Sequence, residues 1–303
     1  MSSAITVSGL RKTYGSFVAV DDVDLQVESG EVFAFLGPNG AGKTTTIDIL
    51  TGAQRRTSGT VSVLGRDPQN DEREWRAQVG VVPQGTADYQ ELTVYEVIDH
   101  FATFYPDPFP TEQLIDMVGL RAKTKTYTTK LSGGQRRRLD VAVGVVGRPR
   151  LLFLDEPTTG LDPEARREAW ELVRLLTGEG MTTVLTTHYL DEAQELSQRI
   201  GVIAGGRMLH VGTLDQLAQL TGSRHRVSYD LDPLAEVPLD LATRLESEPH
   251  SCLYATNEPT ALLRLLLDAA QRRGIAEIPG LQVTQPGLER IYIDMIEQAK
   301  EQR

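Results

Sequence analysis

Residues 37–44 read Gly37-Pro38-Asn39-Gly40-Ala41-Gly42-Lys43-Thr44, directly after the apolar run 32–36 and directly before the segment 45–50. This order predicts a strand, a glycine-rich loop and a helix. Glycines let successive backbone N–H groups turn inward, so that the N-terminus of the following helix points at an anion. In such a loop Lys43 reaches the β- and γ-phosphates of a nucleotide, and the Thr44 hydroxyl coordinates Mg²⁺. The alternative is a glycine-rich turn that has nothing to do with nucleotides. Because this full string with these flanks seldom arises by chance, the stretch predicts nucleotide binding.

Length, composition and charge restrict the class of protein. The chain has 303 residues, enough for a main domain and a smaller one. Its net charge of −11, from 42 acidic and 31 basic residues, argues against a broad nucleic-acid contact surface. The single cysteine, Cys252, has no partner for an internal disulfide, and the N-terminus lacks a signal-peptide pattern. We therefore expect a cytoplasmic protein. Its longest apolar run, 141–147, is too short for a membrane span, so a membrane role would require a partner chain.

A second apolar run ends in two acidic residues. Residues 151–154 are followed by Asp155 and Glu156, a pattern typical of a strand buried on both faces of a parallel sheet. Open α/β sheets place their chemistry at the carboxyl ends of such strands. Asp155 suits Mg²⁺, held directly or through water, and Glu156 suits a water molecule that attacks a phosphate. Paired acids can also be solvated turn residues, an interpretation that the preceding strand and the phosphate loop disfavour.

Five further features are ambiguous when each is taken alone. Tyr14 is either a surface aromatic or a ring that stacks on a base. Gln84 is either a solvated strand end or a contact to Mg²⁺ or to the attacking water. The string Ser132-Gly133-Gly134-Gln135 opens a helix, either as an ordinary N-cap or as a second anion-binding terminus. His188 follows a strand and is either structural or part of a site, whereas Arg136-Arg137-Arg138 favours a solvated helix face over a binding patch.

The remaining sequence has the periodicity of an α/β protein. Antiparallel strands are predicted at 4–10 and 17–27, with a turn at 11–15. The segment 92–128 has helical periodicity that is interrupted at 106–110, which indicates a helical insert at about 86–145. Further strands are predicted at 59–65, 78–84 and 182–187, a hairpin at 200–212, and helices at 136–146 and 164–176.

Composition shifts near residues 221–223, and a small α+β unit is predicted beyond them. Its strands are expected at 226–230, 251–255 and 280–283, and its helices at 259–271 and 287–299. In the first of these helices, the residues expected to face inward are Leu262, Leu263, Leu266 and Leu267. No residue set in this unit has the spacing of ligands or catalytic groups.

Together the motifs resemble the ATP-binding subunit of an ABC transporter over residues 4 to about 220. The resemblance rests on Tyr14, the 37–44 loop, Gln84, Leu131-Ser132-Gly133-Gly134-Gln135, the 151–156 strand, Gly160-Leu161-Asp162 and His188. It implies a P-loop cassette at 1–220, with a parallel-sheet core, an antiparallel β subdomain and a helical subdomain, followed by a small α+β domain at 224–303. The segments 136–142 and 287–289 look most like ATPases of multidrug and antibiotic exporters of the daunorubicin-resistance type.

The resemblance also implies ATP and Mg²⁺ as cofactors, with a role for each motif residue. Tyr14 would stack on adenine, Gln84 would link the nucleotide to the membrane subunit, and His188 would contact the γ-phosphate. Asp155 would bind Mg²⁺ and Glu156 would be the catalytic base. The expected catalytic residues are thus Glu156, His188 and Gln84; the expected metal ligands are Thr44, Gln84 and Asp155; and the other nucleotide-binding residues are Gly37, Pro38, Asn39, Gly40, Ala41, Gly42, Lys43, Thr45, Ser132, Gly133, Gly134, Gln135 and Asp162.

The function that the resemblance implies is a motor. Two subunits pack head to tail, so that the 132–135 helix terminus of one closes over the phosphate loop of the other. ATP closes the dimer, hydrolysis opens it, and an integral membrane permease converts the cycle into export of a hydrophobic compound. The chain would then lie peripherally on the inner face of the cell membrane. Two alternatives stay open: an importer ATPase, and a soluble ABC ATPase acting on nucleic acid or ribosomes, which the acidic balance disfavours.

Overall fold

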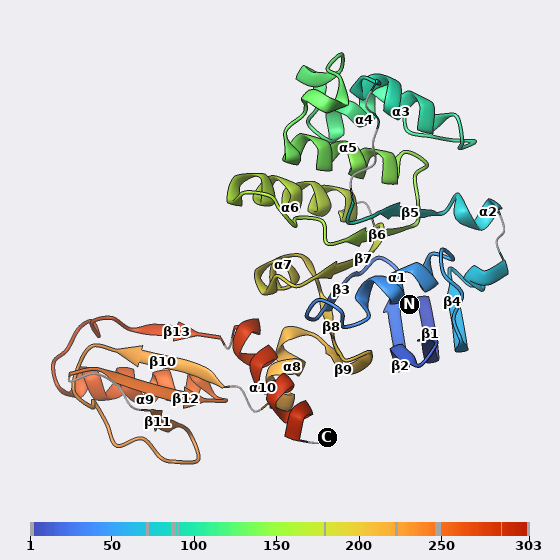
Figure 1. The fold of residues 1–303 in the computed structure, drawn as a ribbon. Coiled ribbons are helices and arrows are strands. Elements are labelled where there is room, and N and C mark those ends of the chain that lie inside the picture. The colour runs from blue at the N-terminus through green and yellow to red at the C-terminus, as the bar shows by residue number, and fades with distance from the viewer. Residues whose placement is uncertain are drawn as a thin grey trace. The chain divides into compact units, whose positions relative to one another are not determined.

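The computed structural model describes residues 3–70, 73–85, 89, 91–178, 180–221, 224–245, 250–285 and 287–301. The chain forms two compact units, residues 1–213 and 214–303 (Figure 1). Within the described ranges, no helix combines the length and the apolar character needed to cross a membrane.

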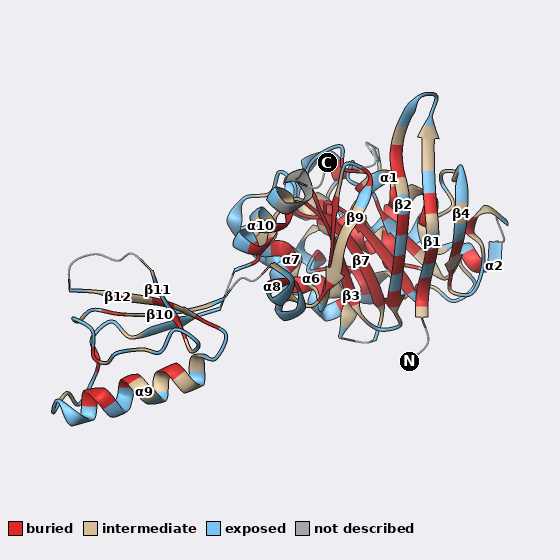
Figure 2. Ribbon diagram, turned by 90° about the horizontal axis from the view of Figure 1, so that it is seen from below, coloured by how far each residue is buried: buried red, intermediate tan, exposed pale blue. Residues whose placement is uncertain are grey.

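A six-stranded sheet forms the centre of the first unit, in the order β5-β6-β7-β3-β8-β9. All neighbouring strands are parallel except β8 and β9, which pair antiparallel. The strands are β3 (Val32–Leu36), β5 (Val79–Val82), β6 (Leu151–Asp155), β7 (Thr182–Thr187), β8 (Arg199–Ala204) and β9 (Arg207–Gly212). Every residue of β3, β6 and β7 is buried, as expected for strands covered on both faces (Figure 2). The carboxyl ends of these strands therefore bring the 37–44 loop, the acid pair and His188 to one edge of the sheet.

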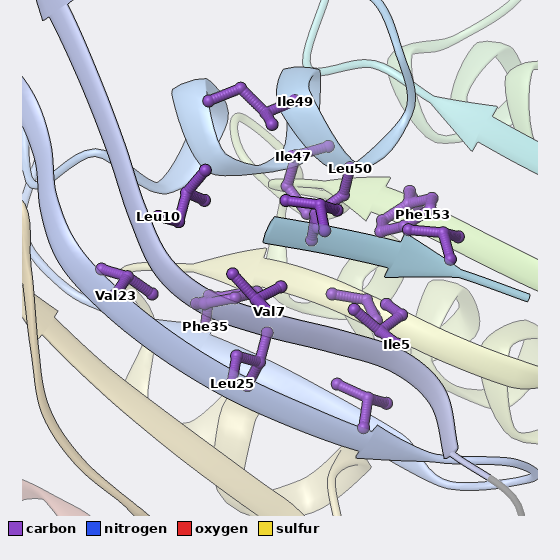
Figure 3. Packing of buried hydrophobic residues seen from close by; sticks show 14 of the residues in the cluster. Ile5, Val7, Leu10, Val23, Leu25, Phe35, Ile47, Ile49, Leu50 and Phe153 are labelled. Carbon is purple, nitrogen blue, oxygen red and sulfur yellow. The ribbon is translucent and has the colours of Figure 1, made fainter. Parts of the chain in front are cut away.

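An antiparallel sheet packs beside this centre, in the order β2-β1-β4. Its strands are β1 (Ser3–Tyr14), β2 (Phe17–Glu28) and β4 (Ser58–Val63). The turn that we expected at 11–15 is wrong in its extent, because β1 continues to Tyr14, which pairs with Phe17. Between the two sheets lies α1 (Lys43–Leu50), the helix that follows the phosphate loop. Figure 3 shows its apolar side chains meeting those of β1, β2, β3 and β6 in one buried cluster. This core holds the loop's helix in place.

Helices make up the segment between β5 and β6. They are α3 (Val94–Ala102), α4 (Thr111–Met117) and α5 (Gly133–Val145), with short 3₁₀ turns at Arg121–Lys123 and Thr128–Lys130. Thr93 caps α3 in a capping box with Glu96, a motif that satisfies the first N–H groups of a helix. The expected interruption at 106–110 is confirmed, since it falls between α3 and α4. The other elements of this unit are α2 (Arg73–Arg76), α6 (Pro163–Thr177), α7 (Leu190–Leu196) and the 3₁₀ turn Pro68–Asn70.

The second unit contains a four-stranded antiparallel sheet in the order β11-β12-β10-β13. The elements are α8 (Leu214–Thr221), β10 (His225–Tyr229), β11 (Thr243–Leu245), β12 (Cys252–Thr256), α9 (Pro259–Arg272), β13 (Gln282–Thr284) and α10 (Leu288–Glu301). Helix α9 lies along one face of the sheet (Figure 2) and buries Leu262 and Leu266 against it. The expectation that Leu267 faces inward is wrong, since this residue is 51% exposed. It lies about 100° around the helix from Leu266, outside the buried stripe.

Candidate active site

The phosphate loop turns from β3 into α1 through a glycine that no other residue could replace. Gly42 has a φ of 101°, and a Cβ atom built on it would lie 2.6 Å from the Ala19 carbonyl oxygen. Left-handed backbone and so close an approach together require glycine. Gly42 is also the N-cap of α1, so no cap side chain satisfies the first N–H groups of this helix. These donors are oriented for an anion at the start of α1.

Lys43 follows as the first residue of α1 and is only 5% exposed. Its Nζ donates hydrogen bonds to the carbonyl oxygens of Gly37 over 2.7 Å and Pro38 over 3.2 Å. The same Nζ lies 3.7 Å from Glu156 Oε1. Burial lowers the pKa of Lys43, whereas the negative charges of Glu156 and Asp155 act in the opposite direction. The ammonium group of Lys43 thus lies among loop carbonyls and carboxylates. At this position it would compensate the negative charge of a nucleotide's phosphates.

Asp155, at the end of β6, shares its carboxylate between two hydroxyl groups. Thr44 Oγ1 donates to Asp155 Oδ2 over 3.1 Å, and Thr186 Oγ1 donates a short hydrogen bond to Oδ1. Burial raises the pKa of nearby Asp48, and the negative charge of Asp155 adds to this effect. The Thr44 hydroxyl and the Asp155 carboxylate form a pair of hard oxygen donors, the type that Mg²⁺ prefers. The residues present therefore fit the metal that the sequence predicts.

Glu156 stands at the turn after β6 with a φ of 45°, a strained value for a residue other than glycine. Its backbone N–H donates to Thr186 O over 3.1 Å and to Thr186 Oγ1 over 3.0 Å, which holds this turn in place. Gln84 Nε2 donates to Glu156 Oε2 over 2.9 Å, and Thr159 Oγ1 donates to the same atom over 3.1 Å. His188 Nδ1 lies 3.3 Å from Glu156 Oε1 without the alignment of a hydrogen bond. The structure therefore brings Lys43, Gln84 and His188 around one carboxylate.

A cleft of about 390 Å³ opens over these groups. Besides Gln84 and Glu156 it is lined by Tyr14, Phe17, Ala19, Asn39, Gly40, Ala41, Gly42, Lys43, Thr44 and Thr45. Tyr14 is 46% exposed, with its hydroxyl accepting a hydrogen bond from Gln54 Nε2 over 3.0 Å and Lys12 Nζ 4.7 Å from its ring centroid. An accessible aromatic face at the mouth of a phosphate cleft suits stacking on a base.

Two other predicted motifs lie outside the lining of this cleft. Ser132 is the N-cap of α5 and forms a capping box, in which Ser132 Oγ accepts from Gln135 N and Gln135 Oε1 accepts from Ser132 N. Asp162 caps α6 and accepts hydrogen bonds from the N–H groups of Glu164 and Ala165. Both helices thus have ordinary N-caps in the single chain. Ser132 and Gly133 are exposed, so this terminus is accessible to a group from outside the chain.

Arg137 is a residue whose role the sequence did not indicate. The solvated helix face expected for Arg136-Arg137-Arg138 is wrong for the middle residue, which is only 6% exposed. Its guanidinium donates to the carbonyl oxygens of Pro83, Asp155 and Pro157. A periodic signal was present, because Val141 and Gly144 follow Arg137 by four and seven residues on the same buried face of α5.

A glycine loop between a strand and a helix, with an acid pair at the end of a strand in the same sheet, defines a P-loop nucleoside triphosphatase. Comparison with known proteins narrows this class. The family model described as ABC transporter matches residues 20–159. The daunorubicin resistance ATP-binding protein DrrA3 of Streptomyces coeruleorubidus is 36% identical over 97% of this chain and 96% of its own length. The chain therefore belongs to the ABC transporter ATP-binding proteins, and it is an ATPase of that family.

Other relatives and a solved structure agree with this assignment. The Nod factor export ATP-binding protein I of Cupriavidus metallidurans is 36% identical, over 88% of this chain and 90% of its own. The linearmycin resistance ATP-binding protein LnrL of Bacillus subtilis is 30% identical, over 96% of this chain and 97% of its own. A solved ATP-binding subunit of an ABC transporter superposes with a TM-score of 0.66 at 27% identity, over 73% of this chain and 94% of its own. The fold class and the family expected from the sequence are thus confirmed.

Proposed function

We propose that this chain is the ATP-hydrolysing subunit that powers export of a hydrophobic compound or drug through a separate membrane subunit. The observation that carries the proposal is the arrangement around Glu156, whose carboxylate is approached by Gln84, Lys43 and His188 beneath the cleft that the phosphate loop lines. Relatives that match nearly the whole chain are named for resistance to daunorubicin and linearmycin, and another is named for Nod factor export. These names favour export over import and over action on nucleic acid or ribosomes.

In this proposal the residues of the cleft divide into binding and chemistry. The N–H groups of the loop and Lys43 bind the phosphates, and Tyr14 stacks on adenine. Thr44, Gln84 and Asp155 would hold Mg²⁺, which compensates phosphate charge when it is bound. Glu156 accepts the proton of the attacking water. Gln84 positions the Glu156 carboxylate, and His188 positions the γ-phosphate.

We further propose that two copies act as a head-to-tail dimer. The capped but exposed terminus at Ser132 supports this arrangement, because it lies outside the cleft of its own chain and is accessible to a neighbour's nucleotide. The dimer would be bound to an integral membrane permease on the cytoplasmic side of the membrane. We propose a cassette at 1–220, with its helical insert at about 86–145, and a C-terminal domain at 224–303. The two compact units, 1–213 and 214–303, support a division into two domains, and they group α8 with the second one.

The test combines hydrolysis with transport. The purified chain should hydrolyse MgATP, and cells that co-express it with an integral membrane permease subunit should accumulate less daunorubicin than cells in which the chain carries Glu156→Gln. Equal accumulation with the wild type and with Glu156→Gln would contradict export of such a compound. Stimulation of hydrolysis by ribosomes or DNA, and not by the membrane protein, would favour the soluble alternative.

A further inference from the structure

The guanidinium of Arg137 makes three directed hydrogen bonds inside the protein. Its Nη1 donates to Pro83 O over 2.6 Å, its Nη2 to Asp155 O over 3.0 Å and its Nε to Pro157 O over 2.8 Å. The first acceptor directly precedes Gln84, and the other two lie immediately before and after Glu156 in the chain. A single side chain thus holds the backbone on both sides of the proposed base and next to its amide partner.

Close packing of α5 on β5 sets the position of this guanidinium. A Cβ atom on Gly80 of β5 would lie 2.3 Å from the Gly144 carbonyl oxygen, and one on Gly144 of α5 would lie 2.5 Å from Val82 Cγ2. The two glycines therefore let helix and strand backbones approach closely. Gly144 lies seven residues, or about two turns, after Arg137 on the same helix face. This contact fixes the position of Arg137, along the axis of α5, relative to the end of β5 and to Pro83, which follows that strand.

The chemistry of the site selects arginine. A planar guanidinium presents several N–H donors in fixed directions, whereas a lysine ammonium offers donors from a single nitrogen atom. The three acceptors that Arg137 has among the described residues are neutral carbonyl groups, so its charge is compensated at longer range. Burial lowers the pKa of Arg137, and the negative charges of Asp140, Asp155 and Glu192 oppose that effect.

We infer that Arg137 is a positioning residue for ATP hydrolysis, which fixes Gln84, Asp155 and Glu156 relative to one another and to α5, the helix that Ser132 caps. This inference rests on the proposed function. A positioning residue differs from a purely structural core residue in what its loss does, because turnover falls in a protein that still folds and still binds ATP. Among the described residues, the hydrogen bonds of Arg137 reach none of the loop residues 37–44, so nucleotide affinity is expected to be spared.

The experiment compares Arg137→Gln and Arg137→Lys with the control Arg138→Gln in the purified full chain. Arg138 is the next residue of the same helix, and it pairs with Glu168 of α6. We expect kcat to fall by about tenfold or more in both Arg137 variants, with the Kd for MgATP changed by less than about threefold. The control should keep both values within about twofold of the wild type. Circular dichroism and urea unfolding establish that each variant is folded.

Chemical rescue keeps the test decisive if a variant folds poorly. Methylguanidinium added to Arg137→Ala should restore part of kcat, whereas methylammonium at the same ionic strength should not, and Arg138→Ala should respond to neither. Wild-type kcat in folded Arg137 variants, an equal loss in the Arg138 control, or kcat and affinity falling in parallel would overturn the inference. A wild-type chain without ATPase activity would instead refute the proposed function itself.

Discussion

Gln84 Nε2 donates a 2.9 Å hydrogen bond to Glu156 Oε2 and so joins the segment after β5 to the turn after β6. The other oxygen of Glu156 lies 3.7 Å from Lys43 Nζ. The carboxylate is therefore oriented by an amide on one side and an ammonium on the other. These contacts give Gln84 a role besides any contact to the metal, namely to hold the proposed base in the cleft.

Removal of the Gln84 amide tests that role. We expect Gln84→Ala to lower kcat by about tenfold or more, because the base loses the donor that orients it, while the affinity for MgATP changes by less than about threefold. Steady-state hydrolysis and equilibrium nucleotide binding measure the two effects. Gln54→Ala is a matched control, since Gln54 donates to Tyr14 at the edge of the same cleft. A kcat equal to that of the wild type would show that Gln84 does not orient Glu156.

The base itself is tested by Glu156→Gln. The amide keeps the shape of the side chain but cannot accept a proton from water, so we expect turnover to fall by about 10²–10⁴-fold with ATP binding intact. The variant should remain a dimer in MgATP, which size-exclusion chromatography detects. Glu168→Gln is the control, because among the described residues Glu168 forms an ion pair with Arg138 alone. Hydrolysis at the wild-type rate would rule out Glu156 as the base.

Lys43→Ala tests the phosphate loop. The substitution removes the buried cation that lies among the carbonyls of Gly37 and Pro38, in a site whose other donors are neutral amides. We expect both the affinity for ATP and the turnover to fall. Fluorescence titration with a nucleotide analogue measures the first quantity and steady-state kinetics the second. Unchanged nucleotide binding would show that this loop is not the phosphate site.

How far the sequence could predict this site depends on how local each feature is. The phosphate loop and the acid pair are strings of adjacent residues that follow apolar strands, so pattern and function coincide at Gly42, Lys43, Asp155 and Glu156. Arg137 is different, because its acceptors lie 18, 20 and 54 residues away. They are also backbone carbonyls, which every residue carries and which leave no sequence pattern.

The fold shows the same distinction. Strands with a clear pattern, such as the long β1 and the continuous apolar run of β3, were predicted. In contrast β11, with three residues of which two are exposed, was not. A strand so short is defined by its pairing with β12, not by its own alternation. The turn at 11–15 was predicted too long, because Gly15 with its flanking polar residues gives a turn signal that spreads beyond the turn itself. Cross-strand pairing, which single-segment patterns do not contain, extends β1 to Tyr14.

A buried acid in α5 gives a prediction on pH. Burial raises the pKa of Asp140 from 3.8 to about 6, against the opposing charges of Arg137 and Arg136, and its Oδ2 has no hydrogen-bond partner among the described residues. A folded pKa above the unfolded one means that the folded state binds more protons between about pH 4 and pH 6, so this group lowers stability as the pH rises through that window.

Asp140→Asn removes the ionisation and keeps the shape. We expect its free energy of unfolding to exceed that of the wild type by about 1–2 kcal/mol at pH 8, after allowance for solvent screening, and the difference to vanish near pH 4. Urea unfolding at several pH values between 4 and 8 measures this difference. Asp99→Asn, at a surface position of α3, is the control. A difference independent of pH would show that the ionisation of Asp140 is not its cause.

Ser132→Arg is expected to abolish hydrolysis without unfolding the chain, and to act across the dimer. Ser132 caps α5 and is exposed outside the cleft of its own chain. A bulky side chain at this position therefore blocks the nucleotide of a neighbouring subunit more than the nucleotide bound by the same chain. Loss of the cap itself costs about 1 kcal/mol of stability, which urea unfolding checks.

Mixing Ser132→Arg with Lys43→Ala subunits tests the trans arrangement. A heterodimer carries both lesions in one composite site and leaves the other site intact, so nucleotide-dependent dimerisation should be restored relative to either variant alone, and partial hydrolysis should return where one site suffices. Analytical ultracentrifugation in MgATP, with one variant fluorescently labelled, counts the heterodimers. If they are no more abundant than homodimers of each variant, Ser132 does not serve a neighbouring subunit, because two defective surfaces on separate chains would then fail to complement each other.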